Sequence, residues 1–345
     1  MQKFAKATAL CAALFLAAML IIDSGSAVKG ARDALSLCSG VLIPSLFPFM
    51  VTSGFIADLP LPRKAEAVLS PLMRAAFRLP CAAAPAVIFG LIGGYPVGAR
   101  MAQRLFLRGE ITDEQAQRLL LFCVNAGPAF VIGTVGASLL SSPEAGVILC
   151  ASLSISSLLL GCFLRFMPHS CADSPQSAGK KSPQSLSLSL VNAVSEGSAG
   201  IVSVCAWVIF FGSVCALIPP GAGRNAALCV LEVTGGCAES AGFSLPVTAS
   251  VLGFGGLCVH CQCFSLASKI PIKPLMFFSA RVLNAVFAAF ICEGLTRVFP
   301  QSISTLAHSG EAFTAAGAAY PPAACALLFL CALVILDLDT CEKVC

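Results

Sequence analysis

The sequence predicts an all-α, polytopic integral membrane protein with about eight spanning helices and two re-entrant hairpins in an inverted repeat. Hydrophobic residues make up 57% of the 345-residue chain and charged residues only 11%, whereas soluble domains are about 25% charged. The mean hydropathy is +0.90, and uncharged runs long enough to form a membrane-crossing helix recur along the chain. These runs lack the alternation of apolar and polar residues found in barrel strands, so helices are expected.

The N-terminal segment has two interpretations. Lys3 and Lys6 precede the apolar run 7–22, and the small residues 25–27 follow it, as in a signal peptide with its cleavage site. The same pattern fits a first spanning helix. The helix is preferred because the later spans form a consistent series when this helix is counted among them.

Eight spans and two interrupted segments follow one another along the chain. The spans are expected at about 5–22, 34–57, 119–143, 144–166, 200–218, 246–268, 275–297 and 319–337. The interrupted segments are expected at about 80–98 and 226–242. Together the spans and interrupted segments define five parts of the chain. These are an N-terminal membrane helix with an outer loop (1–33), a first repeat (34–166), a polar linker rich in Ser, Pro and Lys (167–186), a second repeat (187–299) and a C-terminal membrane helix with a tail (300–345).

The distribution of basic residues predicts how the interrupted segments are placed. Segment 80–98 is followed by four basic residues, namely Arg100, Arg104, Arg108 and Arg118. A complete crossing by 80–98 would put them outside, against the positive-inside rule, whereas a re-entrant hairpin keeps them in the cytoplasm. By the same argument 226–242 enters from the outside. Each half then reads span, re-entrant hairpin, broken span, span, with opposite orientation, which is the inverted-repeat plan of many transporters.

Arginines recur every four residues after the first hairpin, at Arg100, Arg104 and Arg108, and therefore share one helix face. A solvated or headgroup-facing surface is the preferred interpretation, and part of an anion entry path is the alternative. Thr112 is expected to cap the next helix, with Asp113 in the first turn.

Helix-breaking residues interrupt apolar sequence at two places in the first half. Gly93, Gly94 and Pro96 are expected at the tip of the first hairpin, with the next helix beginning near Val97 and directing its N–H groups at a cavity. The second break is 125–128, where Asn125 either binds a polar substrate or caps the break. Broken helices survive in a bilayer only where protein or water covers them. The alternative for each break is a packed structural kink.

The second half carries matching breaks and one acidic residue. Glu232 precedes the glycines of the second hairpin, and an acidic group at membrane depth is by default functional. It is expected to bind a coupling proton or cation, or to hydrogen-bond within the fold, unless it lies near the outer surface. The predicted substrate-binding residues are Gly93, Gly94, Tyr95, Pro96, Gly98, Asn125, Gly127, Pro128, Glu232, Thr234, Gly235, Gly255, Gly256, His260 and Gln262.

Most of the 19 cysteines lie within apolar runs, where small, readily buried residues let helices approach closely. Packing roles are therefore expected rather than a disulfide framework. The segment 258–263 contains three cysteines and a histidine, but a helix brings only His260 and Cys263 to one face. Two ligands are too few for a zinc site, so no metal and no cofactor is predicted.

Several motifs resemble those of the YlbJ-type sporulation integral membrane proteins, of the nucleoside-recognition (gate) domain superfamily. They are 42–49, 94–99, 122–128 and 253–256 with His260 and Gln262, within about 30–300. The resemblance implies a role in endospore formation. It also implies movement of dipicolinic acid, a small planar aromatic dicarboxylate, out of the mother cell across the outer forespore membrane. Two helix N-termini facing a cavity would suit such a dianion.

The function expected from these features is a secondary transporter or facilitator of a small organic anion in a multi-pass membrane protein. An enzyme is not expected, because the sequence has no Gly-rich phosphate loop, no His-Glu-x-x-His motif and no recognisable triad. The lipid bilayer is an expected partner and nucleic acid is not. A coupling proton or cation and a homo-oligomer are left open. Two alternatives stand beside this function, a nucleoside-type carrier and a non-transporting structural membrane protein of spore assembly.

Overall fold

The computed structural model describes residues 2–59, 63–167, 186–240 and 242–299. Regular structure in these ranges is entirely helical, which confirms the prediction of an all-α membrane protein. Five of the described helices are long and apolar enough to cross a membrane, or six if one bent pair forms a span: Ser24–Asp58, Pro143–Leu164, Ser187–Ala216, Leu245–Leu266 and Pro274–Val298, with the pair at Glu66–Phe77 and Cys81–Gly93. The predicted span 319–337 and nearly all of the linker 167–186 lie outside the described residues.

The first half comprises α1 (Gln2–Ile22), α2 (Ser24–Leu37), the π-helical turn η1 (Cys38–Leu42), α3 (Ile43–Asp58), α4 (Arg63–Phe77), the 3₁₀ turn η2 (Cys81–Ala83), α5 (Ala84–Gly93), α6 (Tyr95–Leu107), α7 (Asp113–Phe122), the π-helix η3 (Ala129–Leu139) and α8 (Pro143–Leu164). The second half comprises α9 (Leu186–Ala216), α10 (Ala222–Leu231), α11 (Val233–Ser240), α12 (Leu245–Phe254), α13 (Gly256–Leu266) and α14 (Pro274–Val298).

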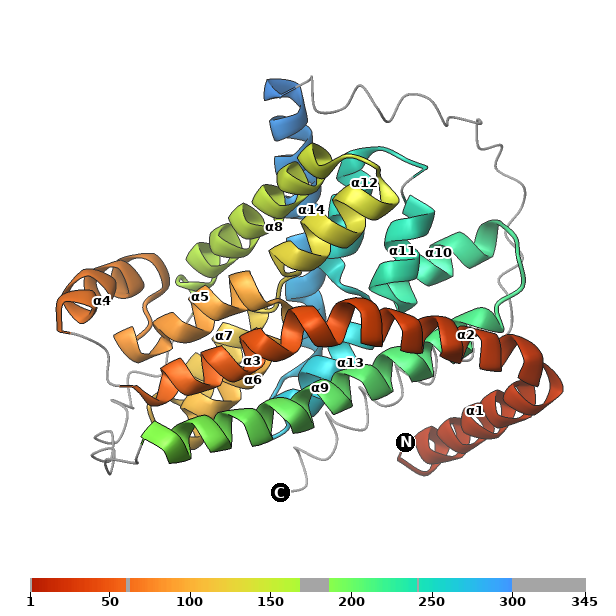
Figure 1. Cartoon of the computed structure of the whole chain (residues 1–345), viewed down its shortest axis with the longest axis horizontal. Coiled ribbons are helices and arrows are strands. Elements are labelled where there is room, and N and C mark those ends of the chain that lie inside the picture. Colours follow the sequence, from red (N-terminus) through yellow and green to blue (C-terminus); the bar gives the residue numbers. More distant parts are fainter. Residues whose placement is uncertain (1, 60–62, 168–185, 241, 300–345) are drawn as a thin grey trace.

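Two long antiparallel helices lie side by side along one edge of the molecule, α2–η1–α3 and α9 (Figure 1). Their backbones approach so closely that a Cβ at Gly30 would overlap the carbonyl oxygen of Gly212. Both helices begin earlier than the predicted spans 34–57 and 200–218. The predicted outer loop before residue 34 is wrong, because helix resumes at Ser24, where Asp23 Oδ1 accepts a hydrogen bond from Ser26 N at 3.2 Å.

Helix α4 lies between the predicted span 34–57 and the predicted interrupted segment 80–98. The segment Glu66–Phe77 is bent by 89° from Cys81–Gly93, and α4 projects from one end of the molecule (Figure 1). It buries Met73 and Phe77 and exposes Val68 and Leu72. Such an amphipathic helix suits the membrane interface.

The predicted helix breaks are present at all four places. The first hairpin is α5–α6 with its tip at Gly94, and the second is α10–α11 with its tip at Glu232. The broken spans are α7–η3, separated by 123–128, and α12–α13, separated at Gly255. One detail was wrong, because α6 begins at Tyr95 and not near Val97.

Corresponding helices of the two halves pack against each other in antiparallel fashion. This holds for α2–α3 against α9, and also for α8 against α14, where Ser156 Oγ donates to Asn284 Oδ1 at 3.1 Å. Asn284 Nδ2 in turn donates to the Gly253 carbonyl at 3.0 Å. An inverted repeat would produce this pairing.

Local capping agrees with the sequence at the start of α7. Thr112 Oγ1 accepts from Gln115 N at 3.4 Å, and Gln115 Oε1 accepts from Thr112 N at 3.0 Å. The pair forms a capping box. The helix that leads to the first broken span therefore has a fixed starting point.

Candidate functional site: a pocket between four helix breaks

The tip of each hairpin lies directly against the break in the following span. In the first half, Gly94 has φ +91°, and a Cβ added there would lie 3.2 Å from Gly127 N. In the second half, Gly256 has φ +75°, and a Cβ there would lie 3.1 Å from Val233 N. Only glycine combines a positive φ with so close a backbone contact. The glycines thus bring four chain interruptions together.

Tyr95 joins the two halves at this point. Its hydroxyl donates a 2.6 Å hydrogen bond to the carbonyl of Leu252, near the end of α12. Its ring lies against Gly255, whose added Cβ would be 3.2 Å from Tyr95 Cε1. Tyr95 therefore connects the first hairpin to the second broken span.

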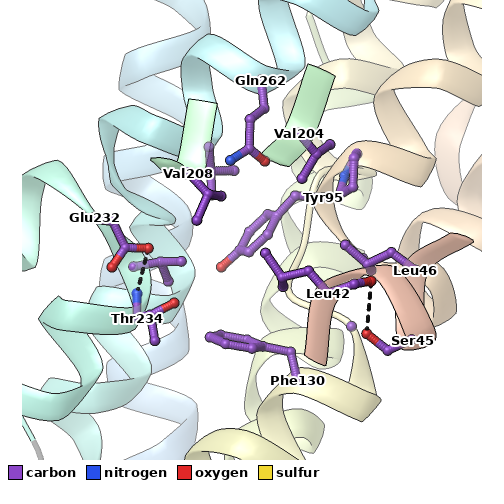
Figure 2. Close-up of a pocket in the computed structure, with 15 residues that line it drawn as sticks. Leu42, Ser45, Leu46, Tyr95, Phe130, Val204, Val208, Glu232, Thr234 and Gln262 are labelled. Carbon is purple, nitrogen blue, oxygen red and sulfur yellow. Dashed lines mark hydrogen bonds between the residues drawn. The ribbon is translucent and has the colours of Figure 1, made fainter. Parts of the chain in front are cut away.

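A pocket opens between these interruptions, with an empty volume of about 530 Å³ that includes space open to the surroundings. The Tyr95 ring lies across its centre, with Glu232 and Thr234 on one side and Leu42 and Leu46 on the other (Figure 2). Helices α3, α9 and α13 and the π-helix η3 complete the wall. The lining residues are Leu42, Ser45, Leu46, Gly94, Tyr95, Pro96, Gly127, Phe130, Val204, Val208, Glu232, Val233, Thr234, Val259 and Gln262.

Glu232 is the acidic residue of the pocket wall, and it caps helix α11. Its Oε1 accepts from Thr234 N at 3.0 Å and its Oε2 from Gly235 N at 2.6 Å. A carboxylate at a helix N-terminus is stabilised by the free N–H groups and by the helix dipole. The protein's own carboxylate thus fills the N-terminal anion position of α11, in agreement with the expectation that Glu232 hydrogen-bonds within the fold.

A buried cation supports the break between α7 and η3. Arg281 of α14 is 0% exposed, and its guanidinium donates to the carbonyls of Leu121 and Val124. Among the described residues no carboxylate lies within ion-pair distance of Arg281. The arginine replaces hydrogen bonds that the helix loses where it ends, and it leaves a positive charge at the break that contains Gly127 of the pocket wall.

Asn125 lies in the same break and is 1% exposed. Its Nδ2 and Oδ1 have no hydrogen-bond partner among the described residues. Such groups are rare in protein interiors. Asn125 therefore has spare hydrogen-bonding capacity two residues from Gly127, although it is not part of the pocket wall.

The structure brings together part of the predicted site. The predicted residues that line the pocket are Gly94, Tyr95, Pro96, Gly127, Glu232, Thr234 and Gln262. The predicted residues outside its wall are Gly93, Gly98, Asn125, Pro128, Gly235, Gly255, Gly256 and His260. Most of these shape the breaks, as Gly98 does where an added Cβ would overlap the Cys123 carbonyl oxygen.

Of the two residues predicted to face the cavity from α13, His260 or Gln262, Gln262 lines the pocket and His260 does not. The residue is fully buried, and its Nε2 lies 2.8 Å from the Phe254 carbonyl oxygen across the Gly255 break. Rings of Phe254, Phe277 and Phe278 surround it. His260 is therefore a structural residue at the break.

No three His, Cys, Asp or Glu side chains come together as a metal-binding group in the part of the chain that the structure describes. Cys258 and Cys263 belong to different apolar clusters. The cysteines of that part are free thiols. Their surroundings agree with the packing role expected from the sequence.

Sequence reasoning missed the apolar and helical wall of the pocket. Phe130 and Val208 carry no distinguishing pattern, because both lie among many similar residues in apolar runs. Arg281 was not among the predicted site residues. Its signal was available, since a lone arginine within an apolar run needs internal partners.

Replacing Gly94 with alanine is expected to destabilise the protein by about 1–3 kcal/mol, because a side chain is strained at this φ and meets the backbone of Gly127. The fraction of folded protein that survives heating, measured by size-exclusion chromatography in detergent, checks this. Gly133→Ala is the matched control, since an added Cβ there meets nothing within 4 Å. Equal thermal behaviour of the two variants would contradict the expectation.

These features define the class of the protein, a polytopic α-helical membrane protein whose interrupted helices surround a partly polar pocket. The chain is similar to the sporulation integral membrane protein YlbJ of Bacillus subtilis (strain 168), with 28% identity over 152 residues. The aligned region covers 44% of this chain and 37% of that protein. The resemblance expected from the sequence motifs is thereby confirmed, and the chain is related to an integral membrane protein of sporulation.

No family model matches the sequence, so membership of the gate-domain superfamily stays a prediction. No solved structure matches it either.

Proposed function

We propose that this chain is a secondary transporter or facilitator of a small organic anion, with dipicolinic acid as the first candidate. The observation that carries the proposal is the convergence of four helix interruptions on one pocket. Interrupted helices at a repeat interface are the usual substrate site of secondary transporters. A membrane anchor or a scaffold has no need of a pocket lined by hairpin tips.

The charges around the pocket require a particular form of anion transport. No Lys or Arg side chain is part of the described pocket wall, and Glu232 is its acidic group. A dicarboxylate would be repelled by an ionised Glu232. We therefore propose that the anion enters together with a proton that neutralises Glu232. The attraction is then supplied by the N-terminus of α6 and by Arg281 behind the break.

The proposed substrate follows from the relative and from the pocket together. The relative's name refers to sporulation, and dipicolinic acid is the substrate that the sequence resemblance implies. Its flat ring suits the space beside Tyr95 and Phe130, where aromatic stacking is available. The proposed location is accordingly the outer forespore membrane, with export from the mother cell.

A nucleoside-type carrier is the second candidate. The absence of a basic side chain from the described pocket wall, and the presence of Gln262 and Thr234 in it, favour a neutral ring compound that accepts and donates hydrogen bonds. A competition experiment compares the two candidate substrates. A nucleoside should inhibit dipicolinate uptake only if both compounds bind this pocket, the nucleoside as a neutral ligand and dipicolinate together with a neutralising proton.

Reconstitution tests the proposal directly. The purified protein is placed in liposomes loaded with terbium, and dipicolinate entry is followed by terbium luminescence under an inward proton gradient. Protein-dependent uptake is expected, and Gln262→Leu should slow it at least about tenfold, since it removes a polar partner worth about 1.5 kcal/mol.

The control is Gln117→Leu, at a half-buried glutamine of α7 outside the pocket wall. No uptake by well-folded protein under either a proton or a sodium gradient would overturn the anion proposal. Nucleoside uptake in the same liposomes would then support the second candidate, and its absence would support a structural role in spore assembly.

A further inference from the structure

The basic face of α6 is ion-paired, with Arg104 buried and Arg100 and Arg108 partly buried, so the prediction of a solvated or headgroup-facing surface was wrong. Arg104 Nη2 lies 2.7 Å from Asp58 Oδ2, and its Nη1 lies 3.1 Å from Glu196 Oε2. Arg100 also reaches Glu196, at 3.2 Å, and Arg108 pairs with Asp58. The side chain of Asp58 is only 4% exposed. These five residues, here named the ion-pair layer, join α3, α6 and α9.

An apolar layer lies between these ion pairs and the pocket. It consists of Met50 on α3, Val97 on α6 and Ile201 on α9, all three buried and packed together. The packing is tight, because a Cβ at Gly200 would overlap Met50 Cε. Water has no path through such a contact.

The two layers follow the pocket in the same order on all three helices. On α3 the order is Leu46, Met50 and Asp58. On α9 it is Val204, Ile201 and Glu196. On α6 it runs from Pro96 through Val97 to Arg100 and Arg104, a rise of about 12 Å at 1.5 Å per residue. The closure is therefore continuous from the pocket wall to the ion-pair layer.

We propose that the apolar layer and the ion-pair layer form the closed cytoplasmic gate of the pocket. The cytoplasmic side follows from the positive-inside rule applied to these arginines. Helices α3 and α9 pack against each other, whereas Val97 and the arginines lie on α6, so a movement of α6 away from this pair separates both layers. Separation leaves arginines without carboxylates, and they can then meet an anion that approaches the pocket. This proposal rests on the pocket of the proposed function.

Asp58 contributes more to the closed gate than Glu196 does. It is buried and bonds two arginines, with Arg104 Nη2 within 2.8 Å of both carboxylate oxygens, whereas Glu196 is 51% exposed. Exposed ion pairs are weak, and buried charge-assisted pairs are strong. Loss of the Asp58 charge should therefore open the gate most.

Native cysteines of α9 report the opening. Cys205 packs against the apolar layer on the pocket side, one turn from Ile201. Cys215 is buried further along the same helix, away from the gate. In inside-out membrane vesicles, a membrane-impermeant methanethiosulfonate is expected to modify Cys205 about tenfold faster in Asp58→Asn than in the unaltered protein. Modification of Cys215, followed by mass spectrometry, should not change.

Two further variants complete the test. Asp113→Asn, at an exposed carboxylate in the first turn of α7, should leave Cys205 unchanged. Glu196→Gln should raise the rate of Cys205 modification about twofold. This variant tests the gate if Asp58→Asn does not reach the membrane. An unchanged Cys205 in both gate variants, or an equal rise at Cys205 and Cys215, overturns the gate. Because no substrate is used, this experiment can contradict the gate while the dipicolinate proposal holds. It can equally support the gate while the dipicolinate proposal fails.

Discussion

Replacing Arg281 with leucine is expected to slow dipicolinate uptake at least about 100-fold, equivalent to about 2.7 kcal/mol in the transport barrier. The guanidinium bonds the carbonyls of Leu121 and Val124, where α7 ends at the first break. A leucine leaves both buried carbonyls unpaired, at a cost of about 1–3 kcal/mol each. It also removes the positive charge at this break. The initial rate of terbium luminescence in liposomes measures the effect.

A lysine at the same position separates the two roles of Arg281. Lysine keeps the charge, but as a single ammonium it does not span two carbonyls in the way that a planar guanidinium does. If charge is the main contribution, Arg281→Lys should retain much of the uptake that Arg281→Leu loses. If the shape of the break is the main contribution, both variants should lose uptake and thermal stability alike.

The control for these variants is on the same helix. Arg297 of α14 has a 78% exposed side chain and pairs with Glu293, four residues earlier. Exposed pairs of this kind contribute about 0.3–0.5 kcal/mol, so Arg297→Leu should change uptake less than twofold. Full uptake by stably folded Arg281→Leu would remove Arg281 from the anion proposal.

The positions of the helix breaks could be predicted from the sequence because they depend on local backbone chemistry. Gly94 and Gly255 adopt positive φ values, which few other residues tolerate, and Pro96 cannot continue a helix inward. The re-entrant placement of the hairpins in the membrane, which rests on the positive-inside rule, stays a prediction. The breaks themselves depend on signals within a few residues, so one sequence suffices to locate them.

The contacts across the fold could not be predicted in the same way. The partners of Arg281 lie 157 and 160 positions earlier in the chain, and the carboxylates that bury the arginines of α6 come from α3 and α9. Helical spacing predicts which residues share a helix face, but it does not predict which residues pack against that face. The surroundings of His260 could not be predicted for this reason, since its spacing alone did not say that the ring would pack among phenylalanines.

Helix lengths were misjudged where the sequence is polar yet still helical. Helix α9 begins at Leu186 instead of near 200, and its first turns contain several serines and Glu196. Serine lowers helix propensity only slightly, and packing against α3 outweighs that difference. The extension matters for function, because it places Glu196 in the ion-pair layer.

Replacing Glu232 with glutamine is expected to remove the dependence of uptake on the proton gradient. Glutamine keeps the shape and one amide-capping oxygen of the side chain, but it carries no charge and binds no proton. In the unaltered protein, uptake should rise at least about tenfold between about pH 8 and about pH 6 on the substrate side, since protonation of the carboxylate removes the charge that repels the anion. In Glu232→Gln it should change less than about twofold over the same range.

The same reasoning predicts which step the glutamine variant retains. A neutral side chain frees the N–H groups of Thr234 and Gly235 from a charged acceptor, so dipicolinate should bind the variant more tightly than it binds the unaltered protein at neutral pH. Glu239→Gln, at a half-buried position of α11 outside the pocket wall, should keep the full pH response. If Glu232→Gln keeps that response too, the coupling proton binds elsewhere, and Glu232 serves only to cap α11.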